Sequence, residues 1–125
     1  MRLRILKKAF WVLSVVVILA VGSYRAYFMI MPEVLVSNTS GTSINSVTVQ
    51  LPNNRIVFGV IAPNVSRTIF YSLNQADGTY KYSIVFETGE IISDECGYVT
   101  DYEIGKVFHI NIKSVNEIEC GGNEV

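Results

Sequence analysis

The feature that most constrains this chain is an uncharged apolar segment close to the N-terminus. Residues 9–24 read AFWVLSVVVILAVGSY and contain no charged side chain. The apolar character resumes after Arg25 in AYFMIM, so residues 9–31 form a nearly continuous apolar run. A helix of that length measures about 34 Å at about 1.5 Å per residue, which is enough to cross a bilayer core of about 30 Å. We therefore predict one transmembrane helix, with lipid as its partner, over residues 9–31.

Charge on either side of this segment predicts how it is oriented. Four basic residues precede it: Arg2, Arg4, Lys7 and Lys8. Positive flanks stay in the cytoplasm, so residues 1–8 are expected inside and residues 32–125 outside, in the periplasm or the extracellular space. An uncleaved signal-anchor is favoured, because a chain starting SYRAYFMIM would carry an exposed apolar tail. The alternative is a signal peptide that is cleaved after Gly22 and releases a secreted domain.

The exported part of the chain is acidic. Residues 1–31 contain five basic and no acidic residues, whereas residues 32–125 contain five basic and eleven acidic residues, a net charge of −6. No basic stripe is available to neutralise phosphates, so nucleic acid is not expected as a partner. The acidic part is long enough for one small domain.

The pattern after Pro32 is that of β-structure. Short β-branched and aromatic runs alternate with turn sequences such as NTSGTS, PNN, NQADG and TG, which is typical of a sandwich or barrel. We predict an all-β domain, an immunoglobulin-like antiparallel β-sandwich of about seven or eight strands. The predicted strands are residues 34–37, 44–51, 55–61, 67–73, 79–87, 90–95, 108–113 and, more weakly, 115–120.

Alternation within these runs predicts which side chains form the core. In a strand, successive side chains point to opposite faces. Three sets are expected to point inward: Val47, Val49 and Leu51; Tyr80, Tyr82, Ile84 and Phe86; and Phe108, Ile110 and Ile112. His109, the only histidine, is expected on the polar face, and the sequence ETGE at residues 87–90 is expected to form a tight hairpin.

Two cysteines, Cys96 and Cys120, allow three kinds of site. A nucleophilic Cys96 is disfavoured because Asp94, Glu95 and Asp101 surround it, and negative neighbours oppose the thiolate. Two cysteines and one histidine are too few for a zinc site. An oxidising compartment and an even cysteine count favour a structural disulfide between Cys96 and Cys120. No metal, cofactor or catalytic motif is predicted.

Part of the sequence resembles a known group of proteins. The stretches LVSNTSGTSINSVTVQL, ISDECGYVTDYEIG and FHINI resemble small bacterial envelope proteins with an N-terminal membrane segment, a compact β domain and a CGYVT strand near the end. ADGTYKYSIVF resembles the turn and strand of immunoglobulin-like or transthyretin-like sandwiches, although the buried tryptophan of antibody domains is missing. The resemblance implies a binding or accessory role.

These observations favour a membrane-anchored, non-enzymatic module that contacts another envelope protein through loops or a strand edge. The candidate contact residues are Tyr98, Asp101, Tyr102 and Glu103, because tyrosine is enriched at interfaces. One alternative is an inhibitor or immunity protein that uses its negative charge to reach a secreted toxin or lytic enzyme. Another is a small thiol-dependent or hydrolytic enzyme that uses Cys96.

Overall fold

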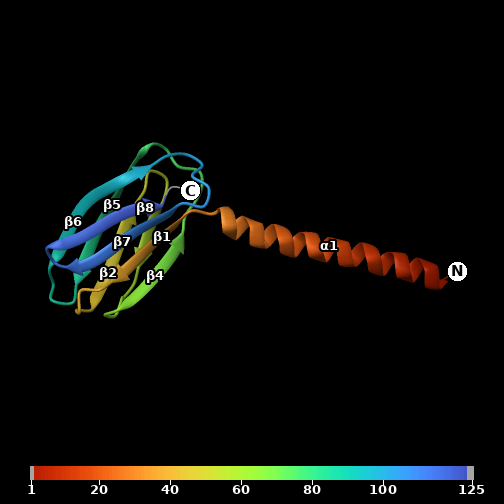
Figure 1. Cartoon of the computed structure of the whole chain (residues 1–125), viewed down its shortest axis with the longest axis horizontal. Coiled ribbons are helices and arrows are strands. Elements are labelled where there is room, and N and C mark those ends of the chain that lie inside the picture. The colour runs from red at the N-terminus through yellow and green to blue at the C-terminus, as the bar shows by residue number, and fades with distance from the viewer. Residues whose placement is uncertain (1, 124–125) are drawn as a thin grey trace. The chain divides into compact units, whose positions relative to one another are not determined.

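A computed structural model describes residues 2–123 of the chain. The chain divides between Ile30 and Met31 into two units, a single helix and a compact β domain (Figure 1). The predicted boundary between anchor and domain, residue 32, lies one residue further along. The last two residues of the predicted domain, 124 and 125, lie outside the described part.

Helix α1 (Arg2–Ile30) contains the predicted apolar segment. It has no acidic residue, and the mean hydropathy of its most apolar window is 2.1, so it is long and apolar enough to span a membrane. A signal sequence near an N-terminus has the same properties. The helix also includes the basic residues 2–8, so helical structure begins before the apolar run does.

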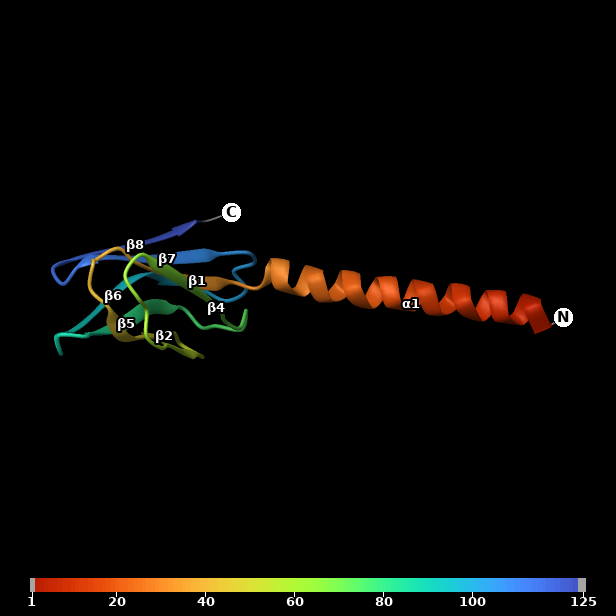
Figure 2. The same cartoon turned by 90° about the horizontal axis from the view of Figure 1, so that it is seen from below.

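Eight strands follow the helix, as predicted. They are β1 (Glu33–Asn38), β2 (Ile44–Gln50), β3 (Arg55–Phe58), β4 (Val65–Phe70), β5 (Gly78–Phe86), β6 (Ile91–Val99), β7 (Val107–Ser114) and β8 (Glu117–Asn123). They form two four-stranded sheets, with the orders β4-β1-β7-β8 and β3-β2-β5-β6. Figure 2 shows the two sheets as separate layers, so the domain is a β-sandwich.

The core between the sheets is formed by the alternating positions that the sequence indicates. All members of the three predicted inward sets are buried, including Leu51, which lies just after the end of β2. Val34 and Val36 on β1 and Ile56 and Phe58 on β3 complete the two inner faces. His109 and Asn111 lie between buried positions of β7 and point outward, as expected. The hairpin between β5 and β6 is also confirmed, since Phe86 N donates to Glu90 O at 2.9 Å.

Four strands differ from their predictions by two or more residues at one end or both. β3 ends at Phe58 rather than at residue 61, and β8 covers Glu117–Asn123 rather than 115–120. β4 begins two residues early and ends at Phe70. Tyr71 N still donates a hydrogen bond to Pro32 O at 3.0 Å, but proline has no N–H with which to continue the ladder. Asn64, in the left-handed region at a φ of 60°, makes the turn that starts β4. β6 continues four residues beyond its predicted end, through the CGYV sequence.

The pairing pattern corrects the predicted antiparallel arrangement at one place. β1 and β7 pair in parallel, from Glu33 opposite Val107 to Asn38 opposite Ile112. β6 ends at the same end of the domain at which β1 begins. Residues 100–106 cross from there directly to the other sheet, so β7 starts beside the start of β1 and runs in the same direction. The order also differs from that of an immunoglobulin constant-type sandwich, in which the first two strands share a sheet; here β1 and β2 lie in different sheets.

The domain has two ends that matter for the sites described next. We call the end at which β1 begins the proximal end. Because β7 is parallel to β1 and β4 is antiparallel to it, β7 begins and β4 finishes at this same end. The connections 51–54, 71–77 and 100–106 lie there, and the connections 39–43, 59–64 and 87–90 lie at the opposite, distal end.

Candidate functional site

The CGYVT sequence at residues 96–100 begins with the predicted disulfide. The sulfur atoms of Cys96 on β6 and Cys120 on β8 are 2.21 Å apart, so the bond joins the edge strand of one sheet to the edge strand of the other. Both cysteines of the chain are used in this bridge. It closes one side of the sandwich, and while it is intact Cys96 has no thiol to offer as a nucleophile.

Gly97 then changes which way the following side chains point. In the β5–β6 ladder, Tyr80 pairs with Cys96 and Gly78 pairs with Val99, so Gly97 and Tyr98 both stand opposite Thr79. This is a β-bulge, with two residues of β6 opposite one of β5. Gly97 has a φ of 68°, as expected for the glycine of a G1 bulge. The extra residue reverses the alternation, so Val99 is buried and Tyr98 is 78% exposed.

After the bulge, residues 98–106 form an ordered loop at the proximal end, which we call the tyrosine loop. Asp101 Oδ1 accepts a hydrogen bond from Gln75 N at 3.2 Å, and Tyr102 N donates to Leu73 O at 2.9 Å. Tyr102 has a φ of 57°, a left-handed conformation that these contacts maintain. The loop is therefore held against the 71–77 connection.

The second acidic residue of the loop is also engaged internally. Glu103 Oε2 lies 2.7 Å from Lys106 Nζ, and the other oxygen of Glu103 accepts a hydrogen bond from Thr100 N. Lys106 Nζ also donates to Tyr98 O. Lys106 is buried, so this ion pair is shielded from much of the solvent.

The four predicted contact residues thus lie in one loop but play two different parts. Tyr98 and Tyr102 point outward and are 78% and 66% exposed. The carboxylates of Asp101 and Glu103 instead hold the loop in place. Sequence reasoning missed Ile104, which is 60% exposed on the same loop. The sequence signal for an exposed Ile104 was its place next to Gly105, outside any run in which apolar and polar residues alternate. The outward surface of the loop therefore combines the side chains of Tyr98, Tyr102 and Ile104 with the exposed Asp101.

Beneath the loop lies a buried aromatic group that supports it. Lys106 Nζ is 5.2 Å from the ring centroid of Tyr80, and the Tyr80 ring is stacked on Phe108 with centroids 3.7 Å apart. The hydroxyls of Tyr80 and Tyr71 are 2.7 Å apart. Burial raises the pKa of Tyr71 to about 12, and burial with the hydrogen bond to Tyr71 raises the pKa of Tyr80 further. Both tyrosines are therefore neutral at physiological pH.

The histidine of the chain lies on the outer face of a sheet. His109 Nε2 is 2.9 Å from Ser37 Oγ on the outer face of its sheet, where it joins a short row of polar side chains with Ser66. Among residues 2–123, no cluster of three or more histidine, cysteine, aspartate or glutamate side chains could hold a metal ion.

A second surface lies on the side of the sandwich away from the disulfide, which we call the open side. There the edge strands β3 and β4 belong to different sheets, and a groove of about 320 Å³ runs between them. It is lined by Val57, Phe58, Gly59, Arg67, Thr68 and Ile69. Arg67 lies opposite the buried Val36 and so occupies the inner face of β4, yet it is exposed. Sequence reasoning did not identify this groove, because it depends on the strand order.

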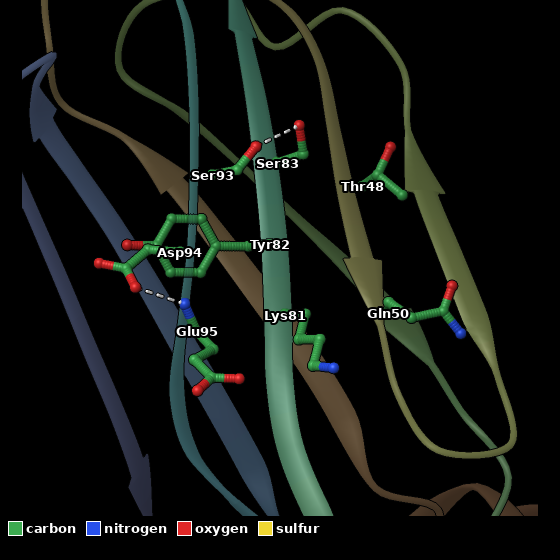
Figure 3. A pocket seen from close by; sticks show the side chains of 8 residues that line it. All are labelled: Thr48, Gln50, Lys81, Tyr82, Ser83, Ser93, Asp94 and Glu95. Carbon is green, nitrogen blue, oxygen red and sulfur yellow. Dashed lines mark hydrogen bonds between the residues drawn. The ribbon is translucent and has the colours of Figure 1, made fainter.

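The sheet β3-β2-β5-β6 carries an open hollow of about 510 Å³ on its outer face (Figure 3). It is lined by Thr48, Gln50, Lys81, Tyr82, Ser83, Ser93, Asp94 and Glu95. Ser93 donates to Ser83 at 3.1 Å, and Asp94 Oδ1 accepts from Glu95 N at 2.8 Å. Tyr82 and its pairing partner Asp94 occupy inward-facing positions of β5 and β6. The other six side chains stand in rows on the outer face rather than converging on one point, so the hollow is mainly a polar strand face.

Comparison with known proteins adds information on the fold only. No protein-family model and no curated protein matches the chain. The chain is similar to a protein from Eubacterium rectale whose structure was solved by NMR, with a TM-score of 0.54 and 6% sequence identity, over 76% of this chain and 90% of that chain. The shared feature is the fold.

Proposed function

We propose that this chain is a membrane-anchored, non-enzymatic binding module, with α1 in the cytoplasmic membrane and the β domain on its outer side. The apolar character of α1 and the basic residues at its N-terminal end support this orientation. The disulfide supports an oxidising location for the domain. The module would hold another envelope protein close to the membrane surface.

The open side is the surface that best supports binding, and the decisive observation is the regular outer edge of β4 at residues 65–69, next to which no further strand lies among residues 2–123. β6 carries the bulge at Gly97, β8 pairs with β7 through a register shift, and the disulfide links these two strands. β3 has only four residues. β4 instead pairs with β1 over six residues without a register shift. A regular, unpaired edge can accept an extended segment of a partner by strand addition.

Charge on the open side favours a partner segment that carries carboxylates. Arg55 on β3 and Arg67 on β4 lie on this side, and no ion pair within residues 2–123 involves either of them. Lys113, near the end of β7, is by contrast paired with Glu117 and Glu119. A second copy of the domain added to β4 would bring one Arg67 toward another. An acidic partner strand avoids this repulsion.

The strand order also bears on the finer description of the fold. Of the two sandwich types that the sequence resembles, the immunoglobulin-like order places the first two strands in one sheet. We propose the transthyretin-like alternative, because β1 and β2 lie in different sheets.

The inhibitor or immunity alternative draws less support from the predicted residues. It relies on the negative charge of the whole domain to steer it to a basic target, and Asp101 and Glu103 are the acidic residues among the predicted contacts. Asp101 accepts a hydrogen bond from Gln75, and Glu103 is paired with Lys106. The thiol-dependent alternative would require the Cys96–Cys120 bond to be reduced first.

A photo-crosslinking experiment tests the strand-addition proposal. A photoreactive residue is placed at Thr68 on β4 or, as a matched control, at Thr88 in the distal hairpin, in the full-length protein in its native membrane. We expect cross-links from position 68 to an acidic extended segment of one protein, and their loss in an Arg67→Glu variant. Equal labelling from position 88, or labelling unaffected by Arg67→Glu, would contradict the proposal.

A further inference from the structure

Two exposed apolar side chains of the tyrosine loop lie at the proximal end, where the chain leaves α1. Glu33 N donates a hydrogen bond to Lys106 O at 2.9 Å, so the end of the loop is bound to the first residue of β1. Tyr102 and Ile104 are 66% and 60% exposed, although the backbone around them is ordered by hydrogen bonds. An ordered loop that presents an aromatic and an aliphatic side chain to its surroundings requires an explanation.

The length of the connection limits how far this loop can be from a bilayer. Residues 9–30, after the basic start of the helix, measure about 33 Å as a helix, close to the hydrocarbon thickness of about 30 Å. The last residues of α1 then lie at the membrane boundary. Three peptide steps from Ile30 to Glu33 span at most about 11 Å. The headgroup region itself is about 5 to 8 Å thick on each side, so Glu33 and the end of the loop lie within or just above it.

The chemistry of the exposed side chains suits this depth. Tyrosine is enriched at the level of the headgroups because it combines an apolar ring with a polar hydroxyl. Of the two acidic residues of the loop, Glu103 is paired with Lys106, whereas Asp101 is exposed and has no cationic partner among residues 2–123. The domain as a whole is acidic, which favours zwitterionic over anionic lipids.

We infer that the tyrosine loop rests on the membrane, with Tyr102 and Ile104 inserted among zwitterionic lipid headgroups. This inference rests on the anchoring role proposed above for α1. The loop would act as a second contact that fixes the tilt of the domain on its short connection. The open side would then be held at a constant orientation to the membrane.

Fluorescence quenching in phosphatidylcholine nanodiscs tests the inference on the full chain. The chain has one tryptophan, Trp11, in α1. Lipids brominated near the headgroup end of the acyl chain quench a tryptophan that reaches that depth. In a Trp11→Phe background, a tryptophan is introduced by Tyr102→Trp or Ile104→Trp. The matched control is Ile91→Trp, because Ile91 is 66% exposed on β6 at the distal end.

We expect tryptophan at positions 102 and 104 to lose intensity in brominated lipid and to emit at shorter wavelength than tryptophan at 91. Trp11 of the unmodified chain reports whether α1 is inserted. If Trp11 is not quenched, the anchoring proposal fails and the inference falls with it. If Trp11 is quenched but positions 102 and 104 behave like 91, the lipid contact alone is overturned. A shift at 102 in native membranes but not in pure lipid would assign the loop to a protein partner and would also overturn it.

Discussion

The backbone of Gly97 lies against the edge of the Phe108 ring, so closely that a β-carbon at residue 97 would be 2.6 Å from Phe108 Cε2. The same β-carbon would be 3.3 Å from Cδ2 of Tyr80. These two rings are stacked in the centre of the core. Gly97 therefore combines a positive φ with a close approach, and both requirements exclude other residues.

The first prediction concerns this glycine. Gly97→Ala should destabilise the domain by about 2 to 4 kcal/mol, because the left-handed backbone costs about 1 to 2 kcal/mol and the clash with Phe108 adds a similar amount. Gly41→Ala is the control, since Gly41 has a φ of 78° but a β-carbon there would meet no atom within 4 Å. Urea unfolding of the full-length protein in detergent should show the smaller cost for Gly41→Ala. Equal costs would mean that contact with Phe108 is unimportant.

A second prediction concerns the hydrogen bond between the buried hydroxyls of Tyr71 and Tyr80. Tyr71→Phe or Tyr80→Phe alone should cost about 1 to 3 kcal/mol, because each leaves a buried hydroxyl without its partner. The double variant should cost less than the sum of the two, since neither hydroxyl remains. Urea unfolding of the four proteins measures the coupling free energy. Strict additivity would contradict the proposed pairing.

The same two tyrosines predict how stability depends on alkaline pH. Burial raises the pKa of Tyr71 from 10.0 to about 12 and shifts the pKa of Tyr80 in the same direction. Between pH 10 and pH 12 these tyrosines are deprotonated in the unfolded chain but still protonated in the folded one. Their contribution to the free energy of unfolding is therefore fully present below about pH 10 and decreases above it. Tyr71 alone should account for a loss of about 1 kcal/mol by about pH 11, at about 1.4 kcal/mol per pKa unit. The urea midpoint measured across this range should fall more steeply than in the double Tyr→Phe variant.

Removal of the disulfide should mainly affect the C-terminal strand. The Cys96→Ser, Cys120→Ser double variant is expected to lose about 3 kcal/mol, because a loop of about 25 residues is no longer closed in the unfolded chain. The amides of β8 should then exchange with solvent faster than those of β2, which the bond does not touch. Hydrogen exchange read by mass spectrometry separates the two strands. An unchanged β8 would show that the bond is not needed to hold this edge.

The ion pair between Glu103 and Lys106 should control the order of the tyrosine loop. Glu103→Gln leaves the buried Lys106 cation without its counter-charge and should cost about 2 kcal/mol, within the range for a buried polar group that loses its partner. Exchange at the Thr100 amide should accelerate, since Glu103 is its acceptor. Lys113, exposed and paired with Glu119, supplies the control: Glu119→Gln should change stability much less than Glu103→Gln, because solvent screens an exposed pair.

Much of the fold could be predicted because its signals are local. The alternation in β2, β5 and β7 depends on a period of two along the chain, and the residues it indicates are buried. The disulfide followed from the cysteine count and the expected compartment. The strand order could not be predicted, because the parallel pairing of β1 with β7 joins residues more than 70 positions apart and has no local signature.

The sequence identified residues that share one loop, but not the different parts that their side chains play in it. Two tyrosines and two acids near residue 100 were identified, yet their different roles depend on contacts with the 71–77 connection and with Lys106. The outward direction of Tyr98 depends on the bulge at Gly97, which shifts the alternation by one residue. The open side was missed because it is made by two strands from different sheets.

The parallel pairing of β1 with β7 also determines when the domain can be completed. β1 is the first strand after α1, but one of its two neighbours is made only near the end of the chain. Val34 and Val36 therefore cannot be enclosed until residues 107–112 have emerged, whatever has formed in between. A chain that crosses a membrane helix-first would keep its membrane-adjacent strand half-paired until residues 107–112 have been synthesised, and would be open to chaperones and proteases for that time.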